Sequence, residues 1–162
     1  MPYDPDQHHR RSIRLPQYDY AQPGAYYVTL CTHNRLCFLC QIQDELSRLT
    51  WQGELIKLHW EKLPEHYPFL TLDSYMIMPN HLHGILILGE QHELHLTLPQ
   101  IIQGFKTFSA RAINKLQNTK GIPIWQRDYY EHVIQGEDDL NRIREYIINN
   151  PLKWSEDDYY VE

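Results

Sequence analysis

Two histidines separated by one apolar residue, His81-Leu82-His83, open a β-prone apolar run that continues to Leu88. On a β-strand the side chains at positions i and i+2 point to the same face, whereas the residue between them points to the other. The two imidazoles would therefore lie a few ångströms apart, and imidazole is a common ligand of divalent metals. The pattern predicts half of a metal site. The alternative is a pair of ordinary, partly exposed sheet residues.

A second candidate for chemistry is Tyr146, which Asn150 follows four residues later. Residues four apart project from the same face of an α-helix, and Pro151 marks the point where such a helix must stop. The phenol and the amide would then lie one above the other. Taken alone, this pair is better explained as a packed tyrosine and an asparagine at a helix C-terminus.

The strands that must position these residues are indicated by runs of β-branched and aromatic residues between turn signals. The turn signal Pro23-Gly24 precedes the first run, and Pro79-Asn80 joins the second run directly to the third. The predicted strands cover residues 25–32, 69–78, 81–88 and the second half of 125–134, with 36–39 extending or bulging the first.

Three helices are predicted from apolar residues at helical spacing. The first covers residues 44–63, although Gly53 interrupts it, and Pro64 ends it. The second begins near Pro99 and runs to residue 116, and the third covers 137–149. Short strands separated by helices predict an α+β fold of the ferredoxin-like (split βαβ) type, an antiparallel sheet with helices on one face.

Length and composition limit the class of protein. A chain of 162 residues fits one domain, preceded by an irregular arm (1–22) and followed by an acidic tail (155–162). Three cysteines argue against a disulfide framework and fit a reducing cytoplasm. No apolar run is long enough to span a bilayer, so no membrane partner is expected. The net charge of −6 does not exclude a polyanion, because a local basic face would suffice.

The ordered set of motifs resembles the HUH single-tyrosine transposases, in particular the REP-associated tyrosine transposases of bacteria. "HUH" means histidine, hydrophobic residue, histidine. In this chain the motif is His81-Leu82-His83, within the sequence MPNHLHG at 78–84. The sequences WQRDYYEH at 125–132 and REYIINNPLK at 144–153 are also typical of that family. The resemblance spans residues 10–154 and identifies 23–154 as an HUH catalytic domain with the HUH endonuclease fold.

The resemblance implies a reaction and a site. In this family the two histidines bind Mg²⁺ or Mn²⁺, and a polar residue one turn after the tyrosine completes the site. Here His81, His83 and Asn150 would be the ligands, and Tyr146 would be the nucleophile. Attack on a DNA phosphate would give a 5′-phosphotyrosine and a free 3′-OH that can later rejoin strands. A phenol with a pKa of about 10 needs help to lose its proton. His132 is a candidate helper by position only, and an ordinary structural histidine is the better interpretation of it.

The implied partner is single-stranded DNA with a REP-like hairpin, bound by a cytoplasmic, nucleoid-associated protein. Basic residues in the arm and around the fourth predicted strand could contact its phosphates. They are Arg10, Arg11, Arg14, Lys106, Arg111, Lys115, Lys120 and Arg127. Tyr129 and Tyr130 could stack on bases or fill the core. Related enzymes work as monomers or as homodimers that exchange the tyrosine helix, and the sequence leaves both arrangements open.

Two other classes of function fit parts of the pattern. A DNA-binding protein of the same fold could have lost cleavage, although every candidate site residue is present. A metal-dependent phosphoesterase for small substrates could use the same histidines, but it would leave Tyr146 without a role.

Overall fold

The computed structural model describes residues 14–91 and 93–162, so the predicted contacts of Arg10 and Arg11 lie outside the described residues. Its main sheet is antiparallel, with strands in the order β4-β5-β1-β6. These strands are β1 (Gly24–Cys31), β4 (Leu70–Met78), β5 (His81–Leu88) and β6 (Tyr130–Val133). The helices are α1 (Trp51–Glu61), α2 (Leu63–His66), α3 (Leu98–Leu116) and α4 (Gly136–Asn149), with 3₁₀ turns η1 (His33–Arg35) and η2 (Pro151–Glu156). The predicted α+β class with an antiparallel sheet is confirmed.

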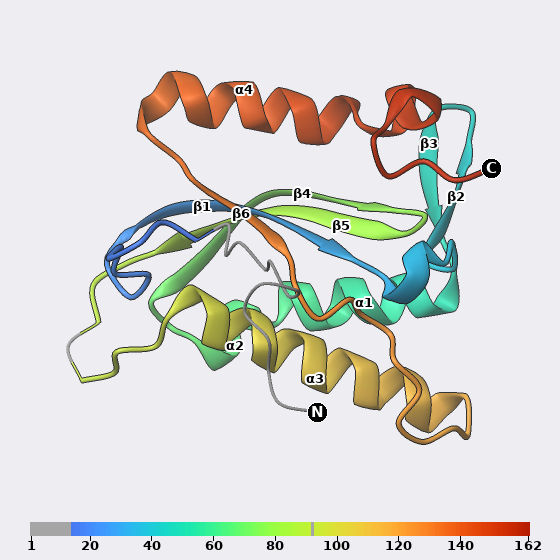
Figure 1. The fold of residues 1–162 in the computed structure, drawn as a ribbon, viewed down its shortest axis with the longest axis horizontal. Coiled ribbons are helices and arrows are strands. Elements are labelled where there is room, and N and C mark those ends of the chain that lie inside the picture. Colours follow the sequence, from blue (N-terminus) through green and yellow to red (C-terminus); the bar gives the residue numbers. More distant parts are fainter. Residues whose placement is uncertain (1–13, 92) are drawn as a thin grey trace, which may run out of the picture.

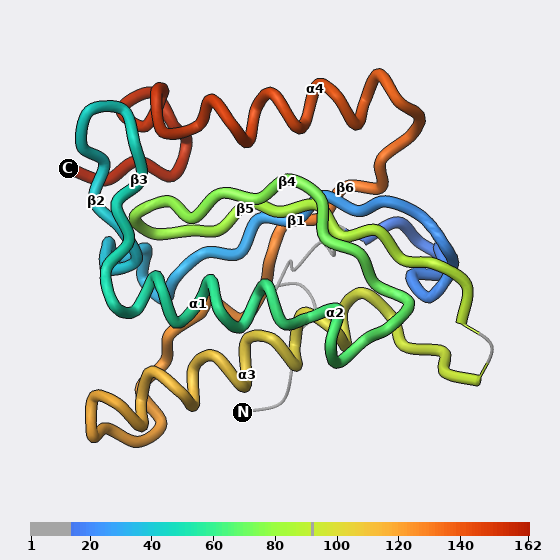
Figure 2. The backbone as a smooth tube through the Cα atoms, turned by 180° about the vertical axis from the view of Figure 1, so that it is seen from behind, coloured from blue at the N-terminus to red at the C-terminus, as the bar shows by residue number. Residues whose placement is uncertain are grey.

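The helices divide between the two faces of the sheet. The ribbon places α1, α2 and α3 on one face and α4 across the other (Figure 1), and the reverse view gives the same division (Figure 2). The expectation that all helices lie on one face is therefore wrong for α4. The physical reason is a second apolar surface on the sheet, where Tyr27 and Ile85 pack against Ile143 and Ile147 of α4.

Strand alternation in β5 sends its residues to opposite faces. Leu82, Leu86 and Leu88 join the large apolar cluster against α1 and α3, whereas Ile85 packs toward α4. On the large-cluster side, α3 begins with a capping box between Thr97 and Gln100. Of its apolar residues at helical spacing, it buries Ile101, Ile102, Phe105 and Ile113, whereas Phe108 and Leu116 are exposed. The sheet is thus covered on both faces, and β5 contributes to both.

The region before α1 differs from the expectation. Residues 40–49 form a hairpin of β2 (Cys40–Gln43) and β3 (Leu46–Leu49), so a helix over 44–63 is wrong in its first part. Asp44 and Glu45 have φ values of 51° and 63°, the left-handed conformation that a two-residue hairpin turn requires. The helix begins at Trp51, after the N-cap Thr50. Residues 36–39 precede this hairpin and do not extend β1.

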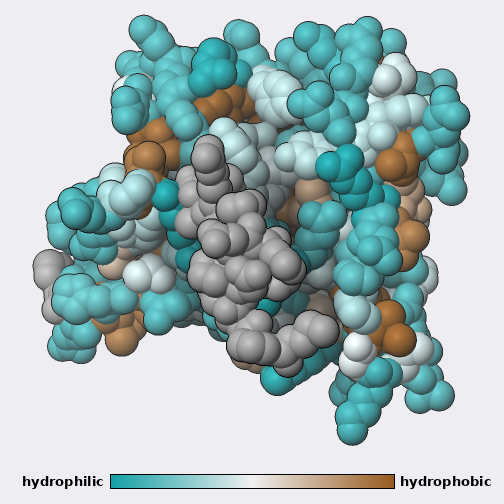
Figure 3. Space-filling model, in the orientation of Figure 1, coloured by the Kyte–Doolittle hydropathy of each residue, from teal (hydrophilic) through white to brown (hydrophobic). Residues whose placement is uncertain are grey.

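Within the described ranges, every helix is too short or too polar to cross a bilayer. The space-filling view gives the surface character of one face of the molecule (Figure 3). Hydrophilic side chains cover most of α4, and hydrophobic ones appear as separate small patches. The side of α4 seen in this view is therefore mainly polar.

Candidate active site

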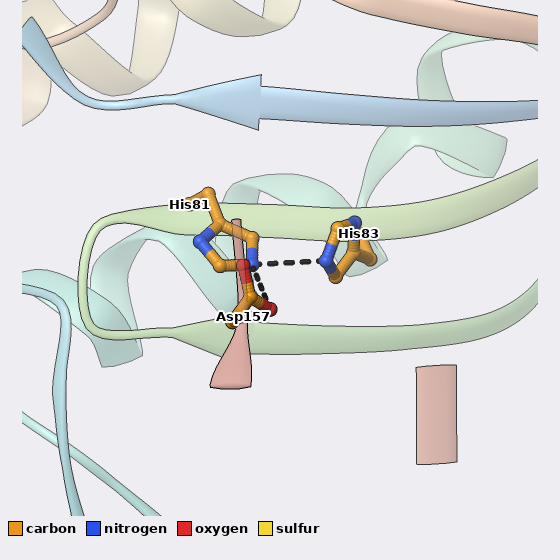
Figure 4. A group of neighbouring side chains, drawn as sticks. All are labelled: His81, His83 and Asp157. Carbon is orange, nitrogen blue, oxygen red and sulfur yellow. Dashed lines mark hydrogen bonds and ion pairs between the residues drawn. The ribbon is translucent and has the colours of Figure 1, made fainter. Parts of the chain in front are cut away.

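The two histidines of β5 lie side by side beneath α4. Their side chains are almost fully buried, with exposures of 0% for His81 and 1% for His83. The Nε2 atoms of the two rings are 2.9 Å apart and face one another (Figure 4). This is the arrangement that the alternation of the strand predicts, with both imidazoles on the face opposite Leu82.

The other nitrogen of each imidazole has a partner that fixes the ring. The Nδ1 of His81 is 2.8 Å from the Oδ1 of Asn80, an amide oxygen that accepts the Nδ1–H. The Nδ1 of His83 lies 2.8 Å from both the Tyr27 hydroxyl and the Thr29 Oγ1. Such outer partners orient metal-binding histidines and set which nitrogen carries the proton. Both Nε2 atoms are left to face the shared space.

Burial keeps both imidazoles in the neutral form. It lowers the pKa of His81 to about 4, although the carboxylate of Asp157 opposes the shift. Burial also lowers the pKa of His83 well below its usual range, and His81 adds to this effect. Neutral imidazole is the form that binds metal ions. At neutral pH neither ring therefore carries a positive charge that would repel a metal ion.

Helix α4 brings the predicted nucleophile and amide to the same place. The ring of Tyr146 lies 5.4 Å from that of His83, centroid to centroid, and it is 47% exposed. Asn150, one turn further along the chain, is buried, and its Oδ1 has no hydrogen-bond partner. The four residues that the family resemblance singled out are thus gathered around one point, within a single chain.

Two cavities meet at Tyr146. One, of about 480 Å³, is lined by Tyr27, Thr29, His83, Tyr130, His132, Arg142, Ile143, Tyr146, Asp158 and Tyr159. The other, of about 360 Å³, is lined by Arg142, Glu145, Tyr146, Asn149, Asn150, Lys153, Glu156, Asp157 and Asp158. Burial and the nearby Asp157 carboxylate raise the pKa of Tyr146, so its phenol is protonated at neutral pH. Both cavities border the Tyr146 side chain.

The sequence reasoning missed the C-terminal segment, which it treated as an acidic tail. Asp157 has a side chain only 1% exposed, and its Oδ2 lies 3.8 Å from the Nε2 of His81. Because His81 is neutral, this approach is not an ion pair. The Tyr159 ring lies 4.7 Å from the His81 ring. No spacing or pattern sets Asp157 apart from the acidic residues beside it, so the sequence held no usable signal.

The donor atoms of this site fit a divalent metal ion. One nitrogen from each histidine and one carboxylate oxygen of Asp157 all lie within 4.8 Å of one another. The oxygens Asn150 Oδ1 and Asp157 Oδ2 are both buried without a hydrogen-bond partner, and a buried polar atom without a partner is costly. Imidazole and oxygen donors together suit first-row divalent ions such as Mn²⁺.

The His132 side chain is hydrogen-bonded within the protein, to Asp139. Its Nε2 lies 2.8 Å from the Oδ2 of Asp139, which also accepts the backbone N–H of Gln135. The other oxygen of Asp139 accepts from Arg142 at 2.5 Å. These bonds lower the pKa of Asp139 and connect β6 with the first turns of α4. His132 lines the cavity, but its contact is to the helix and not to the phenol.

Two of the basic residues proposed for DNA have partners inside the protein. The Nε of Arg14 lies 3.6 Å from the Oε1 of the buried Glu131. The ammonium group of Lys106 donates to the backbone carbonyls of residues 126, 127 and 128, at 2.9, 3.3 and 3.2 Å. Burial lowers the pKa of Lys106 to about 8. Lys106 therefore fixes the loop before β6 and has its three donors in use.

The other basic residues are gathered along α3. A groove of about 540 Å³ runs between α3 and the chain that follows it, and no acidic side chain is among the residues lining it. Four exposed basic side chains line it together with Lys106: Arg111, Lys115, Lys120 and Arg127. The structure thus unites these predicted residues in one basic groove, on the side of the sheet opposite the histidines.

Comparison with known protein sequences gives one family and two relatives. Residues 32–150 match the family model described as "Transposase IS200 like". An uncharacterized protein of Haemophilus influenzae is 36% identical across 99% of this chain and 98% of its own length. A second H. influenzae protein, designated as a candidate REP-associated tyrosine transposase, is 28% identical across 83% of this chain and 74% of its own length.

Comparison with solved structures supports the fold. The structure of a REP-associated tyrosine transposase bound to a REP hairpin superposes with a TM-score of 0.65 at 22% identity, covering 88% of this chain and 74% of the other. A candidate transposase from Deinococcus radiodurans superposes with a TM-score of 0.50 at 21% identity, covering 85% of this chain and 97% of the other. Both share the arrangement of sheet and helices.

Proposed function

The chain belongs to the IS200-like transposase family, and from this premise we propose that it cleaves and rejoins single-stranded DNA near hairpins through a 5′-phosphotyrosine. The observation that carries the proposal is the position of Tyr146, whose half-exposed ring lies against His83 where two cavities meet. The hairpin substrate is supported by the similar fold of a transposase bound to a REP hairpin. With such a substrate, the protein would act in the cytoplasm, in association with the nucleoid.

In the proposed reaction the phenol oxygen of Tyr146 attacks a phosphorus atom of the DNA backbone. A bond forms between that oxygen and phosphorus, and the bond from phosphorus to the 3′ oxygen breaks. The leaving 3′ oxygen takes up a proton, and the phenol gives one up to solvent in the open cavity. Attack by another 3′-OH reverses the step and joins strands. The covalent bond conserves the energy of the phosphodiester, so no other energy source is needed.

The residues that would hold the ion are His81, His83 and Asn150, which meet beside Tyr146. A bound Mg²⁺ or Mn²⁺ would supply Lewis-acid stabilisation of the phosphate charge. Asn80 orients His81, and Tyr27 and Thr29 orient His83. The protein's own contribution is to hold two neutral imidazoles and one amide oxygen in fixed positions before the substrate arrives.

Basic groups on both faces of the sheet would bind the DNA backbone. Arg142 lies one turn before Tyr146 on α4, lines both cavities, and is held by Asp139. A guanidinium in this place suits a phosphate next to the scissile one. The basic groove along α3 would hold the phosphates of the hairpin. Tyr130, which lines the cavity and is 45% exposed, is in position to stack on a base.

The test uses single-stranded oligonucleotides that contain hairpins from around the gene, incubated with the full chain and Mn²⁺. Oligonucleotides labelled at the 3′ end should give a labelled protein band on a denaturing gel, because the downstream fragment stays attached through its 5′ phosphate. Those labelled at the 5′ end should give only a shorter DNA. The protein band should vanish with EDTA and in Tyr146→Phe.

Other outcomes separate the alternatives. Hairpin binding without any covalent product would indicate a DNA-binding protein that has lost cleavage. Hydrolysis of small phosphoesters that persists in Tyr146→Phe would indicate a phosphoesterase. Mixing Tyr146→Phe with His83→Ala tests whether one chain supplies the whole site. The mixture should stay inactive, because Tyr146 meets the histidines of its own chain, and restored cleavage would require exchange of α4 between subunits.

A further inference from the structure

The chain beyond α4 carries an acidic side chain into the site. We propose that Asp157 is a ligand of the divalent ion, so that the C-terminal segment completes a metal site of two imidazoles, one amide and one carboxylate. This inference rests on the metal dependence proposed above. It assigns a role to a residue outside the motifs that define the histidine pair and the tyrosine helix.

The position of the carboxylate is the first argument. Asp157 Oδ2 lies 3.8 Å from His81 Nε2, beyond hydrogen-bonding distance, and both atoms belong to the group whose members lie within 4.8 Å of one another. Figure 4 shows this oxygen directed at the space between the two imidazoles. Donor atoms bound to one ion at about 2.0–2.2 Å are separated by roughly 3 to 4 Å. The spacing here needs only small side-chain shifts to reach that geometry.

The hydrogen bonding of the carboxylate is the second argument. Asp157 Oδ1 accepts the backbone N–H of Tyr159 at 2.7 Å, whereas Oδ2 is buried without a hydrogen-bond partner. A buried carboxylate oxygen without a partner is strongly unfavourable, and such groups are normally paired or bound to metal. One oxygen therefore fixes the orientation, and the other is left for a cation.

The backbone of the segment is held in place independently of the Asp157 side chain. Asn80 Nδ2 donates to the carbonyl of Tyr159 at 2.7 Å, while the Oδ1 of the same amide binds His81. The guanidinium of Arg35 lies 5.4 Å from the centre of the Tyr159 ring. One asparagine thus connects a histidine ligand to the segment that carries Asp157. Removing the charge of Asp157 should leave this docking in place.

A carboxylate changes what the site prefers to bind. It adds a negatively charged, hard oxygen to two neutral imidazoles and a neutral amide, and such oxygens favour Mg²⁺ and Mn²⁺. The positive ion also compensates the buried negative charge. We therefore expect Mn²⁺ binding without DNA, and we expect the ion to stabilise the segment around residues 157–160 against local opening.

The experiment measures Mn²⁺ binding to the full chain without DNA, from the loss of the electron paramagnetic resonance signal of free Mn²⁺. Asp157→Asn should raise the Kd at least about tenfold, the lower end of what loss of a metal-site partner causes. Asp138→Asn is the matched control, because Asp138 is an exposed acidic residue in the first turn of α4 and lines neither cavity. The Kd of this control for Mn²⁺ should stay within about twofold of the wild-type Kd. Amide exchange in residues 157–160 should slow with Mn²⁺ in the wild type and not in Asp157→Asn.

The outcomes separate this inference from the proposed function. An equal Kd for Asp157→Asn and the wild type, with binding lost in His81→Ala, would overturn the role of Asp157 and leave the histidine site standing. No Mn²⁺ binding by the wild type would overturn both. Circular dichroism identifies any variant that fails to fold, and Asp157→Ala replaces Asp157→Asn in that case, with the same expected change.

Discussion

The two faces of the sheet are built from the same strands but have different compositions. Along β5, Leu82 and Leu86 enter the large apolar cluster with α1 and α3, while His81 and His83 enter the space beneath α4. A shift of one residue along the strand separates the two environments. One face of β5 therefore contributes to stability and the other carries the candidate site, so substitutions at neighbouring positions should have different effects.

The two faces also differ in how their helices are held. On the α3 side the buried cluster is continuous and apolar. Among the described residues on the α4 side, the buried apolar cluster consists of Tyr27, Ile85, Ile143 and Ile147, with four partly buried residues packed against it. An ion pair between Arg144 of α4 and Asp73 of β4 adds to it, with N–O distances of 2.8 and 2.6 Å. The tyrosine helix therefore packs on the sheet through a smaller buried apolar cluster than α3 does.

The largest expected effect is on cleavage and comes from the α4 face. His83→Ala should reduce DNA cleavage about 10³-fold, because metal-derived stabilisation is worth several kcal/mol and each 1.36 kcal/mol is tenfold in rate. Ile85→Val, two residues along on the same face, is the control. It should cost about 1 kcal/mol of stability and leave cleavage near the wild-type rate. Equal cleavage by His83→Ala and the wild type would contradict the assignment.

The next effect is on stability and comes from the opposite face. A Cβ at Gly84 would overlap the buried ring of Trp60. Gly84→Ala should therefore lower the free energy of unfolding by about 1–3 kcal/mol, and the Tm should fall by roughly 2–4 °C for each kcal/mol. Chemical denaturation measures the first quantity. At temperatures below the unfolding transition, the cleavage rate should remain within about twofold of the wild-type rate. Loss of cleavage with an unchanged Tm would show that the two faces of β5 do not have separate roles.

A smaller effect is expected for the basic groove along α3. The double variant Arg111→Gln, Lys115→Gln should weaken hairpin binding about tenfold at low salt, and the slope of log Kd against log salt should fall by about one for each charge. Lys62→Gln, an exposed lysine at the end of α1, should change neither. Fluorescence anisotropy with a labelled hairpin measures both quantities. An unchanged salt slope in the double variant would exclude the groove from DNA binding.

The smallest effect concerns the ion pair that holds α4. The guanidinium of Arg144 lowers the pKa of Asp73 from 3.8 to about 2. The folded chain then binds fewer protons than the unfolded chain between those values, so this stabilisation is complete above pH 3.8 and is lost as the pH falls through 2. Asp73→Asn should cost about 1 kcal/mol near pH 7, since solvent screens the pair. The free energy of unfolding of Asp73→Asn should become equal to that of the wild type only below pH 2, and a difference that persists there would show that the ion pair is not its cause.

Much of the site could be predicted because its spacing is local. The strand alternation at His81 and His83, and the helical spacing of Tyr146 and Asn150, each place two side chains on one face without any knowledge of the fold. Bringing the two pairs together required the family resemblance, and the structure supplies the physical contact between Tyr146 and His83. The roles of these four residues remain predictions that the experiments above address.

The sequence-based predictions were wrong or incomplete where contacts between distant parts of the chain determine the structure. Leu46 and Leu49 fit a helical spacing, but a left-handed turn at residues 44 and 45 makes them a strand. From the sequence, Lys106 was expected to contact DNA phosphates. Its ammonium group instead donates hydrogen bonds to backbone carbonyls about twenty residues further along the chain. Asp157 enters the site only through tertiary contacts of the segment that carries it. None of these has a local sequence signal.

The most direct test of the central claim is to identify the residue that becomes attached to DNA. Several tyrosines line the same cavity, among them Tyr27, Tyr130 and Tyr159, so a covalent band alone does not name the nucleophile. After nuclease and protease digestion of the Mn²⁺ reaction, mass spectrometry should find a 5′-phosphonucleotide on the peptide that contains Tyr146 and on no other. A nucleotide on another tyrosine, or no modified peptide while hairpin DNA is bound, would contradict the account.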